Sequence, residues 1–383
     1  MQQPSFLYTT CQIGAETALK REVAARYPEF RFAYSRPGFI TFKLPAERPL
    51  KQDFRLESIF ARAHGFVIGK VSGETLEERA KQVVELAAQQ PFTQLHVWPR
   101  DQYTPGYRGY TPGLNEASHE AREAILAAWP ESDPRRGWLV QPPGEKPGQL
   151  VLDCVLVGPN EWWVGYHRTS GCVSRLPGGL QSLELPPHAV SRAYLKMREA
   201  LAWAQFPFQP DQQAVEIGCA PGGASQALLE AGLLVTGIDP AEVDPVVAGN
   251  PRFQHVRKRG ADVQRREFRK TRWLTADMNV APQYTLDTVE AIVTHPEVDI
   301  RGLLLTLKLL DWDLAALLPE YLDRIRGWGY RDVRARQLQF NRQEICVAAL
   351  RGGSRRQEPR KALNGAKRKG RGQGTQSAGN KER

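Results

Sequence analysis

The sequence is poor in cysteine, and the positions of its cysteines exclude two common uses of this residue. The five cysteines are an odd, scattered set without any pair in C-x-x-C spacing. Disulfide frameworks use even numbers of cysteines, and structural zinc sites use closely spaced pairs. The seven histidines are dispersed as well. We therefore expect neither a disulfide framework nor a metal site. The cysteines are Cys11, Cys154, Cys172, Cys219 and Cys346.

Long apolar runs are also missing. No segment approaches the roughly 20 apolar residues that a transmembrane helix needs, and the N-terminus lacks a charged-then-apolar signal pattern. We expect a cytoplasmic protein without a membrane partner. The 383 residues, 41% of them hydrophobic, suffice for two or three packed domains. Nothing in them demands more than a monomer.

Positive charge is present in excess, but it is concentrated. Residues 351–383 carry 11 Lys/Arg and 2 Asp/Glu, a net +9 (11 − 2) out of +10 for the chain. This Gly-, Gln- and Arg-rich tail is predicted to be disordered. It either holds nucleic acid through phosphate contacts or only increases solubility. Residues 252–272 form a second basic segment, with nine Lys/Arg, that we expect to face RNA; a solvated helix face is the alternative.

Residues 215–239 organise the rest of the chain. They predict a short buried strand, a glycine-rich turn, a helix and a second strand that ends at Asp239. Asp239 follows Gly218 by 21 residues, close to the spacing at which a carboxylate binds a ribose diol. The segment therefore predicts the nucleoside-binding half of a doubly wound sheet, although simple strand–helix turns also use glycine. The turn glycines are Gly218, Gly222 and Gly223.

The turn itself indicates which nucleoside is bound. A dinucleotide site needs G-x-G-x-x-G, but Ala220 takes the place of the second glycine and Pro221 follows it. This excludes a nicotinamide oxidoreductase. A wider turn suits a ligand with an amino-acid tail and no phosphate, which describes S-adenosylmethionine.

The chain before this segment predicts two small α+β units. Their boundaries are placed at residues 1–72 and 73–168, followed by a Gly/Pro/Ser-rich linker at 169–190. Within the second unit, residues 98–110 interleave aromatic rings with Arg100 and Arg108. Such interleaving suits stacking on unpaired bases, or a loop whose rings cover the domain's own core. Trp162, Trp163 and Tyr166 are expected in the core.

Four charged residues lie beside apolar segments. Lys196 is in a predicted helix, and Asp277 and Lys308 end two predicted strands. Charges at such positions need partners, so a structural ion-pair network is one interpretation. The other is a catalytic site in which Lys308 is the base and Lys196 lowers its pKa, while Asp277 and Glu344 position both ammonium groups.

These four residues, in this order, together with Gly218-Cys-Ala-Pro-Gly-Gly223, resemble the FtsJ-type ribose 2′-O-methyltransferases, and among them those that methylate a cytidine of bacterial 23S ribosomal RNA. The resemblance reaches to about Leu350 and is specific in the C-terminal half. It implies a Rossmann-like, seven-stranded methyltransferase domain at residues 191–350, preceded by a ferredoxin-like piece and a THUMP-like RNA-binding domain.

The resemblance also implies roles for single residues. Lys308 would be the proton acceptor in a tetrad with Lys196, Asp277 and Glu344, and RNA would be the partner. Two departures are Ala224, where the family has an aromatic residue, and the region of Asp262, where the register of the adenine-contacting acid is unclear. The alternatives are an inactive RNA-binding protein on a methyltransferase scaffold and an amine or base methyltransferase, which the run Asp277-Met-Asn-Val disfavours. The cofactor residues would be Ser191, Gly218, Cys219, Ala220, Pro221, Gly222, Gly223, Asp239, Asp262 and Asp277.

Overall fold

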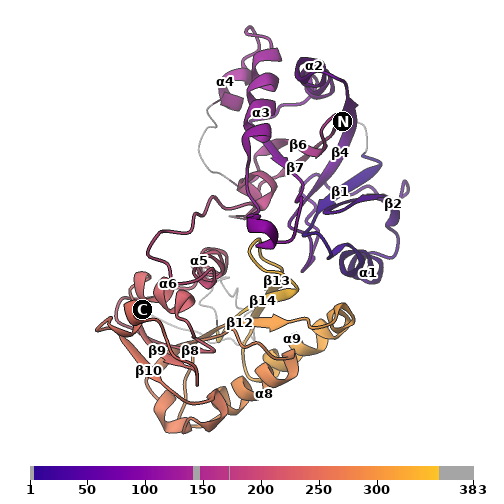
Figure 1. Ribbon diagram of the computed structural model, residues 1–383. Helices are drawn as coiled ribbons and strands as arrows, with labels where there is room; N and C mark the ends of the chain where they lie inside the picture. The colour runs from indigo at the N-terminus through magenta and orange to yellow at the C-terminus, as the bar shows by residue number, and fades with distance from the viewer. Residues whose placement is uncertain (1–3, 141–146, 172, 353–383) are drawn as a thin grey trace, which may run out of the picture.

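The computed structural model describes residues 4–140, 147–171 and 173–352, which form two seven-stranded sheets (Figure 1). Cys172 and most of the predicted basic tail lie outside the described residues. The first sheet has the order β2-β3-β1-β4-β7-β6-β5, and all its neighbouring strands are antiparallel except β5 and β6. Its strands are β1 (Phe6–Thr10), β2 (Arg31–Arg36), β3 (Phe39–Lys43), β4 (Ala63–Ser72), β5 (Gln94–Pro99), β6 (Leu150–Gly158) and β7 (Glu161–Arg168).

Helices cover one face of this sheet because their apolar residues recur with helical spacing. In α2, Ala80, Val83 and Ala87 are buried, and Thr75 and Glu78 form a capping box at its start. The opposite face carries a separate aromatic cluster that includes Tyr8 and Trp98. Trp162 and Tyr166 are buried, as the sequence predicted. The helices are α1 (Glu16–Arg26), α2 (Leu76–Ala87), α3 (Glu116–Ala128) and α4 (Arg135–Val140).

The first sheet crosses the predicted boundary between residues 72 and 73. β4 ends at Ser72 and pairs with β1 on one side and with β7 on the other. Strands from both predicted units therefore share one sheet, so residue 72/73 marks a change of element and not a break between sheets. A division into ferredoxin-like and THUMP-like parts stays a prediction.

The second sheet has the order β10-β9-β8-β11-β12-β14-β13. Its first five strands are parallel, and β14 pairs antiparallel with β12 and β13. This is the predicted Rossmann-like arrangement with a closing antiparallel hairpin. The strands are β8 (Gln213–Ile217), β9 (Leu234–Ile238), β10 (Phe253–Val256), β11 (Thr271–Ala276), β12 (Gly302–Lys308), β13 (Asp332–Arg336) and β14 (Glu344–Leu350).

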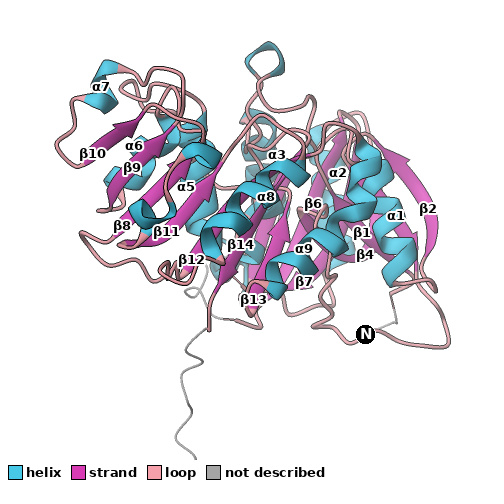
Figure 2. Cartoon of the chain, turned by 90° about the horizontal axis from the view of Figure 1, so that it is seen from below, coloured by secondary structure: helices cyan, strands magenta, loops and turns pink. Residues whose placement is uncertain are grey.

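Helices pack on both faces of the second sheet. Because strand side chains alternate, Leu303 and Leu305 of β12 join the core under α8 and α9, whereas Leu304 joins the core under α5 and α6. Figure 2 shows α8 and α9 on the near side of the strands. The helices are α5 (Ala193–Ala204), α6 (Gly223–Glu230), α7 (Pro245–Ala248), α8 (Pro282–Val293) and α9 (Leu318–Gly327). None of the helices in the described ranges is long and apolar enough to cross a membrane.

Direct contacts join the two halves. The backbone N–H of Gln337 donates to the carbonyl of Ile59 at 2.8 Å, and the rings of Phe60 and Trp312 lie 6.2 Å apart. Arg336 at the end of β13 donates to the carbonyl of Arg62 at 2.5 Å. The N-terminal sheet is thus held against the carboxyl-end loops of the second sheet, where open α/β sheets bind their ligands.

Candidate active site

The predicted glycine turn follows β8 and requires glycine at two positions. Gly218 has φ +82°, and a Cβ there would lie 2.7 Å from the carbonyl oxygen of Asp277. Gly222 has φ +115°, and its Cβ would lie 2.9 Å from Val247. L side chains rarely adopt such φ values. Since β8 and β11 are neighbours in the sheet, the same geometry brings the turn against Asp277.

Two polar side chains face this turn. Asp239 accepts from the backbone N–H of Ala220 at 3.2 Å and from that of Ala241 at 2.8 Å, which orients its carboxylate at the end of β9. Ser191 packs against Gly223, and its hydroxyl has no hydrogen-bond partner within the described residues. A carboxylate at a strand end, a glycine turn whose backbone a ligand can approach closely and a hydroxyl without a partner fit a nucleoside with a polar tail.

Three other predicted cofactor residues lie differently. The thiol of Cys219 is buried beneath β9, where a Cβ on Gly237 would lie 2.7 Å from its sulfur, so only its backbone can face a ligand. Pro221 is exposed, and its carbonyl accepts from Asp244 at 2.9 Å. Asp262 is exposed at the end of a short 3₁₀ turn (Gly260–Asp262) that packs beside Ile217. Its contact with adenine stays a prediction.

The structure brings the four predicted catalytic residues into one chain of ion pairs. Lys308 ends β12 directly opposite Glu344, the first residue of β14. The Lys308 Nζ lies 2.5 Å from Glu344 Oε2 and 2.9 Å from Asp277 Oδ1, one residue beyond β11. Lys196, from α5, pairs with the other oxygen of Glu344. Each carboxylate thus lies beside at least one ammonium group.

The charges in this chain of ion pairs correct the expected direction of the Lys308 pKa shift. Burial alone would lower the pKa of Lys308, but the charges of Asp277 and Glu344 outweigh burial and leave that pKa raised. Burial alone would raise the pKa of Glu344, but Lys196 and Lys308 bring it down to about 2. The prediction that Lys196 keeps Lys308 uncharged is wrong for the protein as it stands, because two carboxylates touch Lys308 while Lys196 contacts only Glu344.

Two residues of the site were missed by the sequence reasoning. Glu216 of β8 is buried and accepts a hydrogen bond from Ser225. Burial raises its pKa to about 8 against the lowering effect of Ser225, and the charges of Asp277 and Asp239 add to the rise. Asn341 donates to Glu344 Oε1 at 3.2 Å. A carboxylic acid between two apolar residues of a strand was the available signal for Glu216.

The predicted basic segment at 252–272 is no helix face. It contains β10 and two 3₁₀ turns. Four of its cations pair with carboxylates: Arg252 with Asp211, Arg257 with Glu242, Arg269 with Glu297 and Arg272 with Asp299. Its net positive character is therefore smaller than its composition indicates.

Within the described ranges, one trio of side chains is close enough to share a metal ion: His96, Asp153 and His167, whose ligand atoms lie within 4.8 Å of one another. The histidines that look dispersed in the sequence are thus brought together by neighbouring strands. His167 Nε2 faces the carbonyl of Ser174 at 2.7 Å and Nδ1 faces Asp153 at 2.6 Å. Both partners accept, so His167 has the contacts of an imidazolium and not of a metal ligand.

An open groove leads to Lys308 from the surface. Its lining includes Ser191, Lys196 and Glu344 from the second half together with Pro105 from the first. A loop of the N-terminal half therefore forms part of the entrance to the charged site.

Comparison with known proteins finds a family match in the second half and relatives along most of the chain. Residues 189–317 match the family described as FtsJ-like methyltransferase. The ribosomal RNA large subunit methyltransferase M of Halorhodospira halophila is 28% identical over 361 residues, which cover 90% of this chain and 96% of that protein. The protein of the same name from Tolumonas auensis is 27% identical, covering 88% of this chain and 93% of that protein.

A match over a shorter stretch of the chain has a higher sequence identity. The ribosomal RNA large subunit methyltransferase M of Xylella fastidiosa is 33% identical over 185 residues, which cover 45% of this chain and 50% of that protein. Among solved structures, magnesium protoporphyrin IX methyltransferase from Synechocystis with bound SAM is 16% identical, with a TM-score of 0.30 over 42% of this chain and 79% of that one. This structural likeness is too weak to add to the sequence matches.

The predicted fold and the predicted cofactor agree with the family. The second sheet has the strand order of a nucleoside-binding domain, and the glycine turn, Asp239 and Ser191 stay the predicted cofactor contacts. Residues 189–317 thus match the FtsJ-like methyltransferases, S-adenosylmethionine is the cofactor, and the chain is similar along most of its length to the ribosomal RNA large subunit methyltransferases M.

Proposed function

We propose that the protein methylates the 2′-hydroxyl of a ribose in large-subunit ribosomal RNA, at a cytidine of 23S ribosomal RNA, in the cytoplasm. The observation that carries this proposal is the position of Lys308, held between Asp277 and Glu344 at the inner end of an open groove and beside the glycine turn. The substrate is inferred from the names of relatives that match about 90% of the chain.

Each residue of the tetrad has a role that follows from its contacts. Lys308 accepts the proton of the ribose hydroxyl, which is a poor nucleophile while protonated. Asp277 and Glu344 hold its Nζ in place, and Lys196 compensates the second oxygen of Glu344. S-adenosylmethionine, when bound, supplies a methyl group on a positively charged sulfur.

The raised pKa of Lys308 means that it must lose a proton before it can act as the base. Only the small uncharged fraction of Lys308 is competent at neutral pH, so the rate of methyl transfer increases with pH until Lys308 titrates.

The N-terminal sheet is proposed to bind RNA, in the manner of the THUMP-like region that the resemblance implies. Its loop at 103–110 reaches the groove through Pro105. The basic tail at residues 351–383, with a net charge of +9, adds non-specific contacts to phosphates. The alternative function is an RNA-binding protein that has lost catalysis, which the presence of all four tetrad residues disfavours.

Methyl transfer to RNA tests the proposal directly. Purified full-length protein is incubated with S-adenosylmethionine carrying a tritiated methyl group and with ribosomal RNA from cells that lack the gene. We expect tritium in large-subunit RNA and a single 2′-O-methyl site that is absent without the gene. Incorporation into transfer RNA alone would redirect the substrate, and RNA binding without any transfer would favour the inactive alternative.

A further inference from the structure

Two arginines at the rim of the groove lack the carboxylate partners that arginines of this chain commonly have. Arg192 precedes α5 by one residue, and Arg342 lies in the loop between β13 and β14; both line the groove that leads to Lys308. Neither forms an ion pair with any described residue. Partial burial, together with the charge of Arg342, lowers the pKa of Arg192. Two like charges in this position leave an excess of positive potential beside the reacting group.

The two guanidinium groups meet at one point of the N-terminal half. Arg342 Nε donates to the carbonyl of Pro105 at 2.8 Å. A Cβ on Gly106 would lie 2.5 Å from Nη2 of Arg342 and would collide with Nη1 of Arg192. Gly106 also has φ +81°, which favours glycine at this turn, and both guanidinium groups lie against its backbone. Both cations are therefore close enough to contact a single oxyanion.

Exposed aromatic rings flank this point. Tyr103 is 42% exposed and Tyr107 is 50% exposed, and their ring centroids lie 5.7 Å apart. The guanidinium of Arg108 lies 5.4 Å from the Tyr107 ring. Large rings exposed together beside unpaired cations are typical of surfaces that bind single-stranded nucleic acid, where bases stack and phosphates are neutralised.

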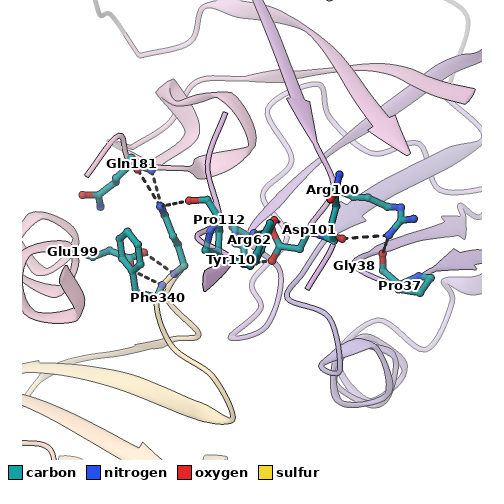
Figure 3. Close-up of polar contacts among 12 residues, drawn as sticks. Pro37, Gly38, Arg62, Arg100, Asp101, Tyr110, Pro112, Gln181, Glu199 and Phe340 are labelled. Carbon is teal, nitrogen blue, oxygen red and sulfur yellow. Dashed lines mark hydrogen bonds and ion pairs between the residues drawn. The ribbon is translucent and has the colours of Figure 1, made fainter. Parts of the chain in front are cut away.

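The loop that carries these rings is anchored firmly at its base. Arg62 and Asp101 form a buried bidentate pair at 2.7 and 2.8 Å, and Tyr110 donates to the same carboxylate at 3.4 Å (Figure 3). Arg100 donates to the carbonyl of Pro37 at 3.1 Å. The alternative in which the rings of this loop only cover the domain's own core does not hold for Tyr103 and Tyr107.

The same loop is tied to the segment that carries Glu344. The side-chain amide of Gln339 donates to the carbonyl of Pro112 at 3.0 Å (Figure 3). The buried carboxylate of Glu199 accepts from the backbone of Gln339 at 2.7 Å and from that of Phe340 at 3.0 Å. Arg342 and Glu344 follow directly in the chain, so the exposed tyrosines and the catalytic chain of ion pairs are held at a defined separation.

We propose that Arg192 and Arg342 bind a backbone phosphate adjacent to the methylated ribose, and that Tyr103 and Tyr107 stack on unpaired bases next to it. This inference rests on the proposed function. The rings favour RNA over the carboxylate of S-adenosylmethionine as the source of the negative charge, because they lie on the loop of the other half that closes over the arginines. The N-terminal half thereby takes part in positioning the substrate at Lys308.

The arginine part is tested with the full-length variants Arg192→Gln and Arg342→Gln. Each is expected to weaken RNA binding about tenfold and to reduce the slope of log affinity against log salt concentration by about 0.7 to 1. The KM for RNA rises while S-adenosylmethionine binding, measured by calorimetry, is unchanged. Arg192→Lys and Arg342→Lys keep the charge and should keep the salt slope.

Arg326→Gln is the matched control, because it removes one positive charge from an exposed arginine of α9 that is paired with Asp323. Its RNA affinity and salt slope should equal those of the wild type. An unchanged salt slope in both groove variants would overturn the proposal, as would a loss of S-adenosylmethionine binding, which would assign the anion to the cofactor. If the wild type itself neither binds nor methylates RNA, the proposed function fails instead.

The stacking part is tested with Tyr103→Ala and Tyr107→Ala. Each is expected to weaken RNA binding about tenfold without changing the salt slope, because stacking releases no counterions. Tyr103→Phe and Tyr107→Phe keep the ring and should keep wild-type affinity. Wild-type affinity in both alanine variants would remove the tyrosines from the proposal.

Discussion

Each sheet of the protein contains a largely buried set of charged side chains, but the two sets occupy different positions in their sheets. In the first sheet, Asp153 is 0% exposed and is bonded to Tyr8 and His167. In the second, Lys308 is 17% exposed at the inner end of a groove. The first set lies across neighbouring strands, whereas the second lies at strand ends.

This difference separates a structural role from a chemical one. A buried charge that is enclosed by its partners stabilises one arrangement of the chain and cannot reach a substrate. A charge at the carboxyl end of a parallel strand is partnered from one side and remains accessible from the other. We therefore expect changes in the first set to affect stability and changes in the second to affect methyl transfer.

The largest expected effect is on catalysis. Lys308→Ala should reduce methyl transfer by about 10² to 10⁴-fold, because the ribose hydroxyl loses its base. Binding of S-adenosylmethionine, measured by calorimetry, should survive. Lys70→Ala in the first sheet is the control, since Lys70 pairs with Glu161 at an exposed position, and its activity should match the wild type. Near-wild-type transfer by Lys308→Ala would show that another group is the base.

A large effect on stability is expected from the first set. Asp153→Asn leaves the imidazolium of His167 without a counter-charge and should lower the free energy of unfolding by about 3 kcal/mol. Asp277→Asn should cost less than about 1 kcal/mol, because Asp277 is partly exposed and Lys308 keeps Glu344. Urea unfolding measures both. A greater loss for Asp277→Asn than for Asp153→Asn would contradict the distinction between the two sets.

The two sets should respond to pH in opposite directions. Burial opposes the charge of His167, but Asp153 and the Ser174 carbonyl outweigh it and leave its pKa raised. Its stabilising contribution is therefore complete below about pH 6.5, the unfolded value, and is lost as pH rises through the folded pKa. Methyl transfer instead rises about tenfold per pH unit below the raised pKa of Lys308.

Urea unfolding and single-turnover rates at several pH values between 6 and 9 would show both trends. His167→Gln should flatten the dependence of stability on pH and leave the slope of the rate unchanged. A methyl-transfer rate that falls over the same range would mean that the uncharged form of Lys308 is not the active one.

The smallest expected effect concerns the connection between the two regions. Gln339→Ala removes the side-chain bonds to Pro112 and Gln181 and should cost about 1 to 2 kcal/mol of stability while reducing methyl transfer a few-fold. Hydrogen exchange should increase in the segments 103–112 and 337–344. Gln283→Ala on α8, which loses only an exposed bond to Asp287, serves as the control. Unchanged exchange in both segments would show that the Gln339 side chain does not couple the halves.

Much of the second half could be predicted from the sequence alone. The apolar alternation of β12, the turn glycines and the carboxylate at the end of β9 are local features, because strand pleat and positive φ values limit which residues fit. Two members of the tetrad, Asp277 and Lys308, were also visible in the sequence as charged residues at the ends of predicted strands. The order of the elements then placed those ends at one edge of the sheet.

Tertiary structure decided what depends on distances between segments remote in sequence. The direction of the Lys308 pKa shift follows from which carboxylates lie nearest, and the meeting of His96 and His167 follows from pairing among distant strands. The approach of Gly106 to Arg192 and Arg342 joins segments separated by more than 80 residues. Coulomb energies fall with distance and rise with burial, and neither quantity can be read from residue spacing.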